Sequence, residues 1–94
     1  MLVLVAYDIS ENKSRNNLIK RLRYFGLYRI QKSLFAGNLT IRERFNLIDD
    51  LEIFLSSERD NVMVFPVCES CKDSYAQFSE VPITLPEDFD FKII

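Results

Sequence analysis

The chain opens on a nearly continuous apolar run that ends in an acidic residue. Residues 2–8, LVLVAYD, are rich in Val and Leu and contain no turn-forming residue. This pattern predicts a strand buried in a sheet, with Asp8 at its carboxyl end. Further strands are predicted at 28–30, 34–39 and 62–68. In the last of these, Pro66 is typical of an edge strand, because proline cannot donate to a central ladder.

The segment after the first strand has the apolar spacing of an amphipathic helix. Ser10 or Asn12 is placed to cap this helix, which is predicted to run to about Phe25. Gly26 then stands where a left-handed residue commonly ends a helix. The stripe expected to face the sheet consists of Leu18, Ile19, Leu22 and Phe25.

A second helix is predicted to begin at Thr40. Glu43 follows three residues later, as in a capping box, in which each of the two side chains accepts a hydrogen bond from the other residue's backbone N–H. Helical spacing then selects the apolar positions expected to be buried: Ile41, Phe45, Ile48, Leu51 and Leu55.

The predicted order is therefore strand, helix, strand, strand, helix, strand. This is the βαββαβ plan of ferredoxin-like α+β folds, in which two helices cover one face of a four-stranded antiparallel sheet. We assign residues 1–71 to this domain and residues 72–94 to a C-terminal segment. Alternating apolar and charged residues in that segment predict a fifth strand. It would pair with the edge of its own sheet or be exchanged with a second copy in a homodimer.

The composition favours an oligomer over a monomer. Of 94 residues, 48% are hydrophobic and eight are Phe. A domain of this size buries only about 60–65% of its unfolded surface, so association would cover the excess, whereas a Phe-rich monomeric core is the alternative. No segment reaches the ~18 apolar residues of a membrane span and no basic leader precedes the first strand, so we expect a cytoplasmic protein with no membrane partner.

The net charge of −2 conceals a strong asymmetry between the two halves of the chain. Residues 1–47 hold nine Lys and Arg against three Asp and Glu, a balance of +6. Residues 48–94 hold three Lys and Arg against eleven Asp and Glu, a balance of −8. One small body therefore carries a surface that attracts anions and another that attracts cations.

Two interpretations of Asp8 follow from its place at the end of a buried strand. Arg15 falls on the sheet-facing side of the first helix, where a guanidinium needs an anion, so it can form an ion pair with Asp8. Alternatively, Asp8 binds a metal. One carboxylate alone holds Mg²⁺ poorly, and the chain has no His, but the second copy in a homodimer would supply another Asp8.

The basic half supplies side chains suited to phosphate contacts. The candidates for nucleic-acid binding are Lys13, Lys20, Arg21, Arg29, Gln31, Lys32 and Arg42. Phosphate neutralisation by this set would give binding that depends strongly on salt and weakly on sequence. A merely solvated basic face is the alternative, and no aromatic RNA-recognition motif is present.

Cys68 and Cys71 have the CxxC spacing of zinc knuckles and redox pairs. A structural zinc site needs four ligands, so zinc would require two copies of the chain. A redox-active pair lacks a thioredoxin-like βαβ context. We expect two free thiols at the end of the last ferredoxin-like strand.

The stretch VAYDISENKSRNNLIKRLRYFGLYRIQKSLFAGNLT resembles the Cas-two family of CRISPR-associated proteins. The matching features are Tyr7-Asp8 at the end of the first strand, Arg15 after a polar gap, Gly26, and RIQKSLF at 29–35. DNVMVFPVCESC at 60–71 is similar to the family's fourth strand. The resemblance covers residues 2 to about 71.

The resemblance implies a ferredoxin-like homodimer in which the last segment pairs with the partner's sheet and Asp8 from both subunits binds Mg²⁺. The positions it places around this site are Tyr7, Arg15, Arg29, Gln31, Ser33 and Phe35, and the candidate catalytic residues are Tyr7, Asp8, Arg15, Ser33 and Phe35. Members are described as metal-dependent endonucleases acting on single-stranded RNA or double-stranded DNA. A second implied role is to bridge the CRISPR integrase during spacer acquisition, with the acidic tail as a docking segment.

The chemistry favours a scaffold over an efficient enzyme. Metal-assisted cleavage needs a nucleophilic water, a group that activates it and stabilisation of the leaving oxygen, whereas an Asp8 pair offers one metal site and no evident general base. Our hypothesis is a nucleic-acid-binding homodimer that supports spacer integration, with weak Mg²⁺-dependent endonuclease activity. The alternatives are a ferredoxin-like toxin ribonuclease and a small-ligand regulatory domain.

Overall fold

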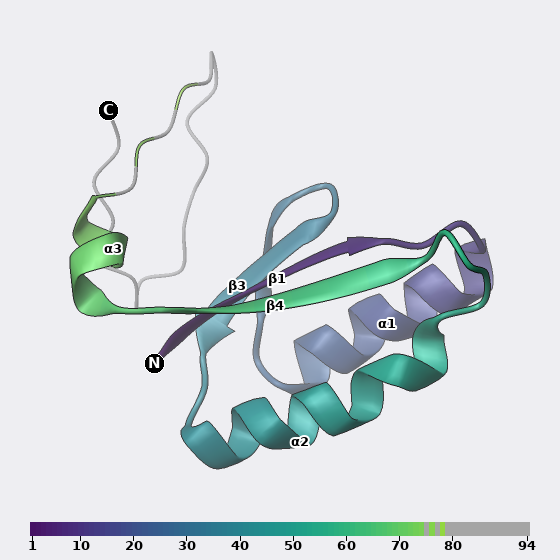
Figure 1. The fold of residues 1–94 in the computed structure, drawn as a ribbon, viewed down its shortest axis with the longest axis horizontal. Helices are drawn as coiled ribbons and strands as arrows, with labels where there is room; N and C mark the ends of the chain where they lie inside the picture. Colours follow the sequence, from purple (N-terminus) through teal and green to yellow (C-terminus); the bar gives the residue numbers. More distant parts are fainter. Residues whose placement is uncertain (75, 77, 79–94) are drawn as a thin grey trace.

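Strands and helices follow one another in the predicted order in a computed structural model of the chain, which describes residues 1–74, 76 and 78 (Figure 1). The elements are β1 (Leu2–Asp8), α1 (Asn12–Tyr24), β2 (Tyr28–Gln31), β3 (Leu34–Asn38), α2 (Ile41–Leu51), the 3₁₀ turn η1 (Glu52–Phe54), β4 (Asn61–Val67) and α3 (Glu69–Asp73). The ferredoxin-like α+β fold is therefore confirmed for the domain.

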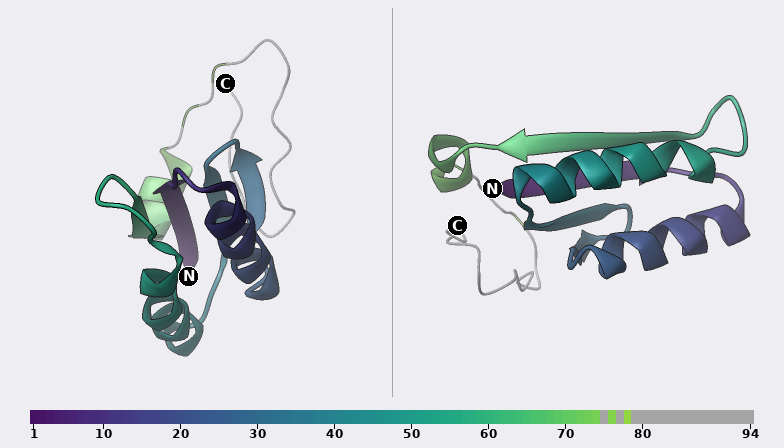
Figure 2. Two further views of the ribbon diagram at one scale, coloured as in Figure 1. Left: turned by 90° about the vertical axis from the view of Figure 1, so that its right-hand side faces the viewer. Right: turned by 90° about the horizontal axis from the view of Figure 1, so that it is seen from below.

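The sheet has the order β2-β3-β1-β4, and each neighbouring pair is antiparallel. In β1, Val5 lies opposite Phe35 on one side and Val64 on the other, so the apolar opening strand is a central strand. The strand that contains Pro66 lies at the edge, as predicted. Helices α1 and α2 lie side by side on one face of this sheet (Figure 2).

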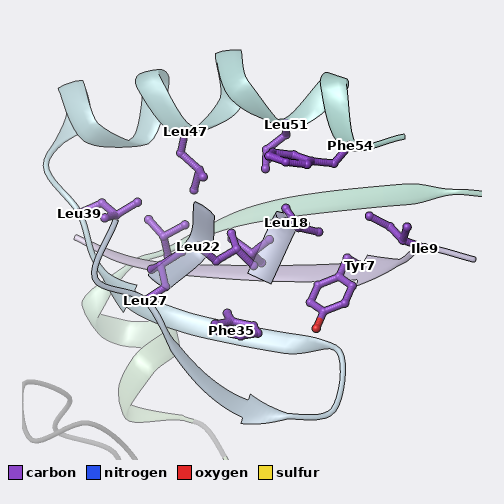
Figure 3. Packing of buried hydrophobic residues seen from close by; sticks show 12 residues of the cluster. Tyr7, Ile9, Leu18, Leu22, Leu27, Phe35, Leu39, Leu47, Leu51 and Phe54 are labelled. Atoms are coloured by element: carbon purple, nitrogen blue, oxygen red, sulfur yellow. The ribbon is translucent and has the colours of Figure 1, made fainter. Parts of the chain in front are cut away.

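The pleat of β1 separates two apolar clusters. Val3, Val5 and Tyr7 belong to the main core. In Figure 3, Tyr7 lies in this core with residues of the helices such as Leu18 and Leu47. The even-numbered residues of β1 point to the opposite face of the sheet, where a smaller apolar cluster forms around Leu2 and Ala36. We call this second side the open face, because α1 and α2 both lie on the other side of the sheet.

The open face presents large apolar side chains to solvent along β4. Met63 and Phe65 are 51% and 45% exposed, and they lie opposite Ala6 and Leu4 of β1. Asp8 comes two residues after Ala6 in β1, so its side chain points to the same face of the sheet as those of Leu4 and Ala6. The candidate acidic residue therefore stands at the end of a partly exposed apolar strip.

The apolar stripe predicted for α1 faces the core, but the predicted N-cap residue is wrong. Leu18 and Leu22 are buried, Ile19 and Phe25 pack against the core at partial burial, and Gly26 has the left-handed φ of 83°. The N-cap is Glu11 rather than Ser10 or Asn12. Ser10 is unavailable because it binds Asp60.

The predicted buried face of α2 is mostly wrong, although the capping box between Thr40 and Glu43 is present. Leu51 is buried as predicted, and it packs in the core with Leu47 and Phe54, which were not predicted. The other predicted positions are exposed: Ile41, Phe45, Ile48 and Leu55 at 60%, 55%, 43% and 41%. The segment is apolar on two sides, and periodicity alone could not show which side turns toward the sheet.

The last strand of the sheet ends one residue earlier than predicted, and a short helix follows it. Cys68 is the N-cap of α3, not the last residue of β4, and α3 extends to Asp73, so the helix crosses the proposed boundary after residue 71. The predicted fifth strand lies outside the described residues, and its exchange remains a prediction. Among the residues that are described, no helix is long and apolar enough to span a membrane.

Candidate functional site

A pocket of about 410 Å³ lies at the carboxyl end of β1, between the start of α1 and the β2–β3 hairpin. Its lining residues are Tyr7, Asp8, Ile9, Arg15, Asn16, Ile19, Arg29, Lys32 and Ser33. The structure thus brings together the predicted acid and three of the predicted cations. Ile9, Asn16 and Ile19 were not predicted as site residues. Ile19 follows Arg15 by four residues, and this helical spacing is a signal that could have placed it at the pocket.

The Asp8 carboxylate is exposed at the end of the ladder, opposite Asn61. Within the described part of the chain it forms neither a hydrogen bond nor an ion pair. Arg15 instead donates one guanidinium N–H to the carbonyl oxygen of Ile9 at 3.3 Å and another to Oδ1 of Asn12. The ion pair between Asp8 and Arg15 is therefore absent, and the carboxylate remains available to a ligand.

Tyr7 is buried and forms hydrogen bonds with the β2–β3 hairpin. Its side chain is 5% exposed, and its hydroxyl donates a hydrogen bond to the backbone oxygen of Lys32 at 3.1 Å. Its backbone N–H donates to the backbone oxygen of Ser33, also at 3.1 Å. The hydroxyl proton is thus committed to the backbone, which makes Tyr7 a residue that positions Lys32 and Ser33 at the pocket.

Phe35, a candidate catalytic residue, is fully buried at 0% exposure. Its ring therefore cannot contact a substrate directly. The guanidinium of Arg29 lies 5.4 Å from the ring centroid, within cation–π distance, and the Tyr7 ring lies 6.2 Å away. Phe35 therefore contributes to the site by packing against Arg29 and Tyr7 from the core.

The charges around the pocket favour an anion. Arg15, Arg29 and Lys32 line it together with a single acid, Asp8. Three cations with adjacent Asn and Ser side chains are suited to phosphate, because guanidinium and ammonium groups bind its oxygens through charge-assisted hydrogen bonds.

The remaining predicted nucleic-acid ligands lie outside the pocket. Lys13, Lys20, Gln31 and Arg42 are exposed. Arg21 is half-buried, pairs with Asp50 at 3.6 Å and covers the ring of Tyr24. Arg42 lies in the first turn of α2. This helix follows the end of β3 that pairs with Leu2, so Arg42 lies at the end of the sheet opposite Asp8.

Asp60 holds together the loops next to this site, a role that the sequence did not reveal beyond a predicted turn. Its side chain is 8% exposed and accepts hydrogen bonds from Ser10 and Ser56, through both the backbone N–H and the hydroxyl of each. The hydroxyl of Ser57 donates a further bond at 3.0 Å. The loop that follows Asp8 is thus tied to the loop before β4.

We expect Asp60→Asn to destabilise the fold in a pH-dependent manner. Hydrogen bonds from Ser10 and Ser56 hold the pKa of Asp60 well below its usual range. Such a carboxylate stabilises the folded state above its unfolded pKa of about 3.9, and the stabilisation is lost as pH falls below that value. Thermal unfolding should show a melting temperature several degrees lower for the variant at neutral pH, and a smaller difference in acid. A difference that does not change on acidification would contradict this role.

The donor set at Asp8 fits a hard cation only in part. Among the described residues no three His, Cys, Asp or Glu side chains converge on one point. Mg²⁺ is commonly held by one or two carboxylates together with waters and substrate phosphates. One chain supplies one carboxylate and a phosphate-binding wall, so the missing ligands would come from phosphate, water or a second copy.

The chain is similar to known proteins in both sequence and fold. The family described as CRISPR associated protein Cas2 matches residues 1–75. A CRISPR-associated endoribonuclease Cas2 of Archaeoglobus fulgidus is 36% identical over 94% of each chain. The crystal structure of a hypothetical protein from Thermus thermophilus is similar with a TM-score of 0.69 at 29% identity, over 92% of this chain and 96% of that one. A crystal structure of Cas2 gives a TM-score of 0.62 at 22% identity, over 92% and 97% of the two chains, and shows the shared fold alone.

Proposed function

The chain belongs to the Cas2 family of CRISPR-associated proteins, and from this premise we propose that it works as a nucleic-acid-binding homodimer in spacer acquisition, with a weak Mg²⁺-dependent endonuclease activity. The observation that carries the proposal is one juxtaposition. Among the residues that the structure describes, the Asp8 carboxylate has no hydrogen-bond or ion-pair partner, and it lies in a pocket lined by three cations at the end of the apolar strip of the open face.

The cationic pocket supports binding to the nucleic-acid backbone. Arg15 and Arg29 are held in place by the Ile9 carbonyl and the Phe35 ring, so little side-chain entropy is lost when they meet a phosphate. Lys32 is presented by a hairpin that Tyr7 fixes. These contacts address phosphates and not base edges, which gives weak sequence selectivity.

The open face supports the homodimer. Met63 and Phe65 expose apolar surface on an edge strand, and association through the same patch on two copies would bury it. Asp8 lies on the same side of β1, at the end of this strip. A two-fold arrangement of two open faces could therefore bring the two Asp8 side chains toward each other.

Asp8 is the residue that would hold Mg²⁺, and when bound the ion would neutralise developing charge on a phosphate. Two facing carboxylates repel each other unless a cation or a proton lies between them, which favours the ion at this place. The chain has no His, and the Tyr7 hydroxyl is bonded to the backbone. With no evident base to activate water, cleavage would be slow.

We place the main role in supporting the CRISPR integrase, because shape, dimerisation and basic surfaces suffice for it. The charge asymmetry suits this role, since residues 1–47 carry +6 and can face nucleic acid. The acidic half, at −8, is left to face a protein partner.

Binding to duplex DNA tests the cationic pocket directly. Lys32→Ala should weaken binding and lower the magnitude of the slope of log K against log salt concentration by about 0.9, the contribution of one phosphate contact. Fluorescence anisotropy of a labelled duplex across a salt series measures both quantities. The matched control is Arg23→Ala, which removes an exposed cation from the last turn of α1 outside the pocket. Equal slopes for Lys32→Ala and the wild type would remove the pocket from the binding surface.

A further inference from the structure

Two thiols lie side by side at the start of α3, away from the pocket and outside the role proposed for it. Cys68 is the N-cap of this five-residue helix, with extended backbone angles of φ −76° and ψ 165°, and Cys71 lies one turn later. Both are free and exposed to solvent. They are the two cysteines of the sequence.

The two thiols, one helical turn apart, differ in acidity. Hydrogen bonding from Cys71 lowers the pKa of the Cys68 thiol. The pKa of the Cys71 thiol is raised, since it donates to Cys68 and would bring a second negative charge beside it. This arrangement pairs an attacking thiolate with a protonated neighbour within reach.

We propose that Cys68 and Cys71 form a redox-active dithiol that small disulfides of the glutathione class oxidise to an intrachain disulfide. The exposure of both thiols gives such a molecule access. Their i, i+3 spacing at the start of a helix brings the side chains close to the separation that a disulfide requires. The extended backbone of Cys68 leaves its side chain outside the regular helix, where it can turn toward Cys71.

The exchange proceeds in two balanced steps. The Cys68 thiolate attacks one sulfur of the small disulfide, forming a mixed disulfide and releasing one small thiolate, which takes up a proton. Cys71 then loses its proton and attacks the Cys68 sulfur, forming the Cys68–Cys71 disulfide and releasing the second small thiol. The two protein thiols are oxidised by two electrons, and the small disulfide is reduced to two thiols.

Mass spectrometry after acid quenching and alkylation tests the assignment of the two roles, with oxidised glutathione as the probe. The reduced wild-type chain should lose both alkylatable thiols without retaining glutathione, in monomeric chains on a non-reducing gel. The Cys71→Ser variant should accumulate one stable glutathione adduct at Cys68. The Cys68→Ser variant should react several-fold more slowly, because the remaining thiol of Cys71 is not the activated one.

Four outcomes would overturn the proposal. The first is equal reaction rates for the two single variants, and the second is a wild type that retains glutathione on both cysteines. The third is a disulfide that joins two chains, and the fourth is protection of the thiols by a stoichiometric zinc ion; either of these two would assign the pair to an intermolecular site. Circular dichroism of both variants checks that each retains the fold, which is expected because the two side chains are exposed.

Discussion

Replacing Asp8 by Ala is expected to lower Mg²⁺-dependent cleavage of RNA and DNA by at least about 100-fold, since losing even an outer-shell partner of a metal ligand costs up to ~100-fold. Binding of nucleic acid should persist and even strengthen slightly. The reason is that the substitution removes the one acid from a pocket whose other charged residues are Arg15, Arg29 and Lys32. The exposed side chain makes no hydrogen bond within residues 1–74, so the fold should be unaffected.

Cleavage of labelled single-stranded RNA and duplex DNA, measured beside anisotropy binding on the same preparations, separates the two effects. Asp49→Asn is the matched control, because it removes an exposed carboxylate from α2 outside the pocket. Retained integration by Asp8→Ala together with integrase would show that catalysis is dispensable for the scaffold role. Equal cleavage by Asp8→Ala and the wild type would mean that the activity does not arise at Asp8.

Phe65→Glu is expected to abolish the proposed homodimer and leave a monomer. Phe65 lies on the open face opposite Leu4 and is 45% exposed, so the substitution adds a charge to the surface of the isolated chain without disturbing its core. In the dimer the same charge would be buried against an apolar patch without a partner. The dimer should weaken by at least about 30-fold, the equivalent of the ~2 kcal/mol that marks a hot-spot side chain.

Analytical ultracentrifugation measures this change as a shift from twice the chain mass to the 11.1 kDa of one chain. Ile53→Glu is the control, because Ile53 is 75% exposed on η1 and not on the sheet. The control should remain dimeric. A Phe65→Glu chain that remains as dimeric as the control would move the interface away from the open face.

The sequence predicted the fold well where local signals are strong. The buried run at 2–8, the left-handed Gly26 and the capping box at Thr40 each depend on a short stretch of chain, and all three are confirmed. The edge position of the Pro66 strand follows from one chemical fact, its missing N–H, and is also confirmed. The face of α2 could not be predicted, because two apolar stripes compete and only tertiary packing decides between them.

Most of the residues that the sequence named around the site lie at one pocket, whereas Gln31 and Phe35 do not line it. Six of the residues named from the sequence line the pocket: Tyr7, Asp8, Arg15, Arg29, Lys32 and Ser33. Periodicity placed Arg15 near the sheet but could not show that a carbonyl and Asn12 would satisfy it in place of Asp8. The Asp60 network was not foreseen, because its donors come from loops distant in sequence.

We propose that two chains share one divalent cation between their Asp8 carboxylates. Isothermal titration of the wild-type protein with Mn²⁺ measures how many ions bind per chain, because Mn²⁺ substitutes for Mg²⁺ with the same preference for oxygen ligands. We expect one ion per two chains, with binding lost in both Asp8→Ala and the monomeric Phe65→Glu. A stoichiometry of one ion per chain, or binding that survives in Asp8→Ala, would contradict the shared site.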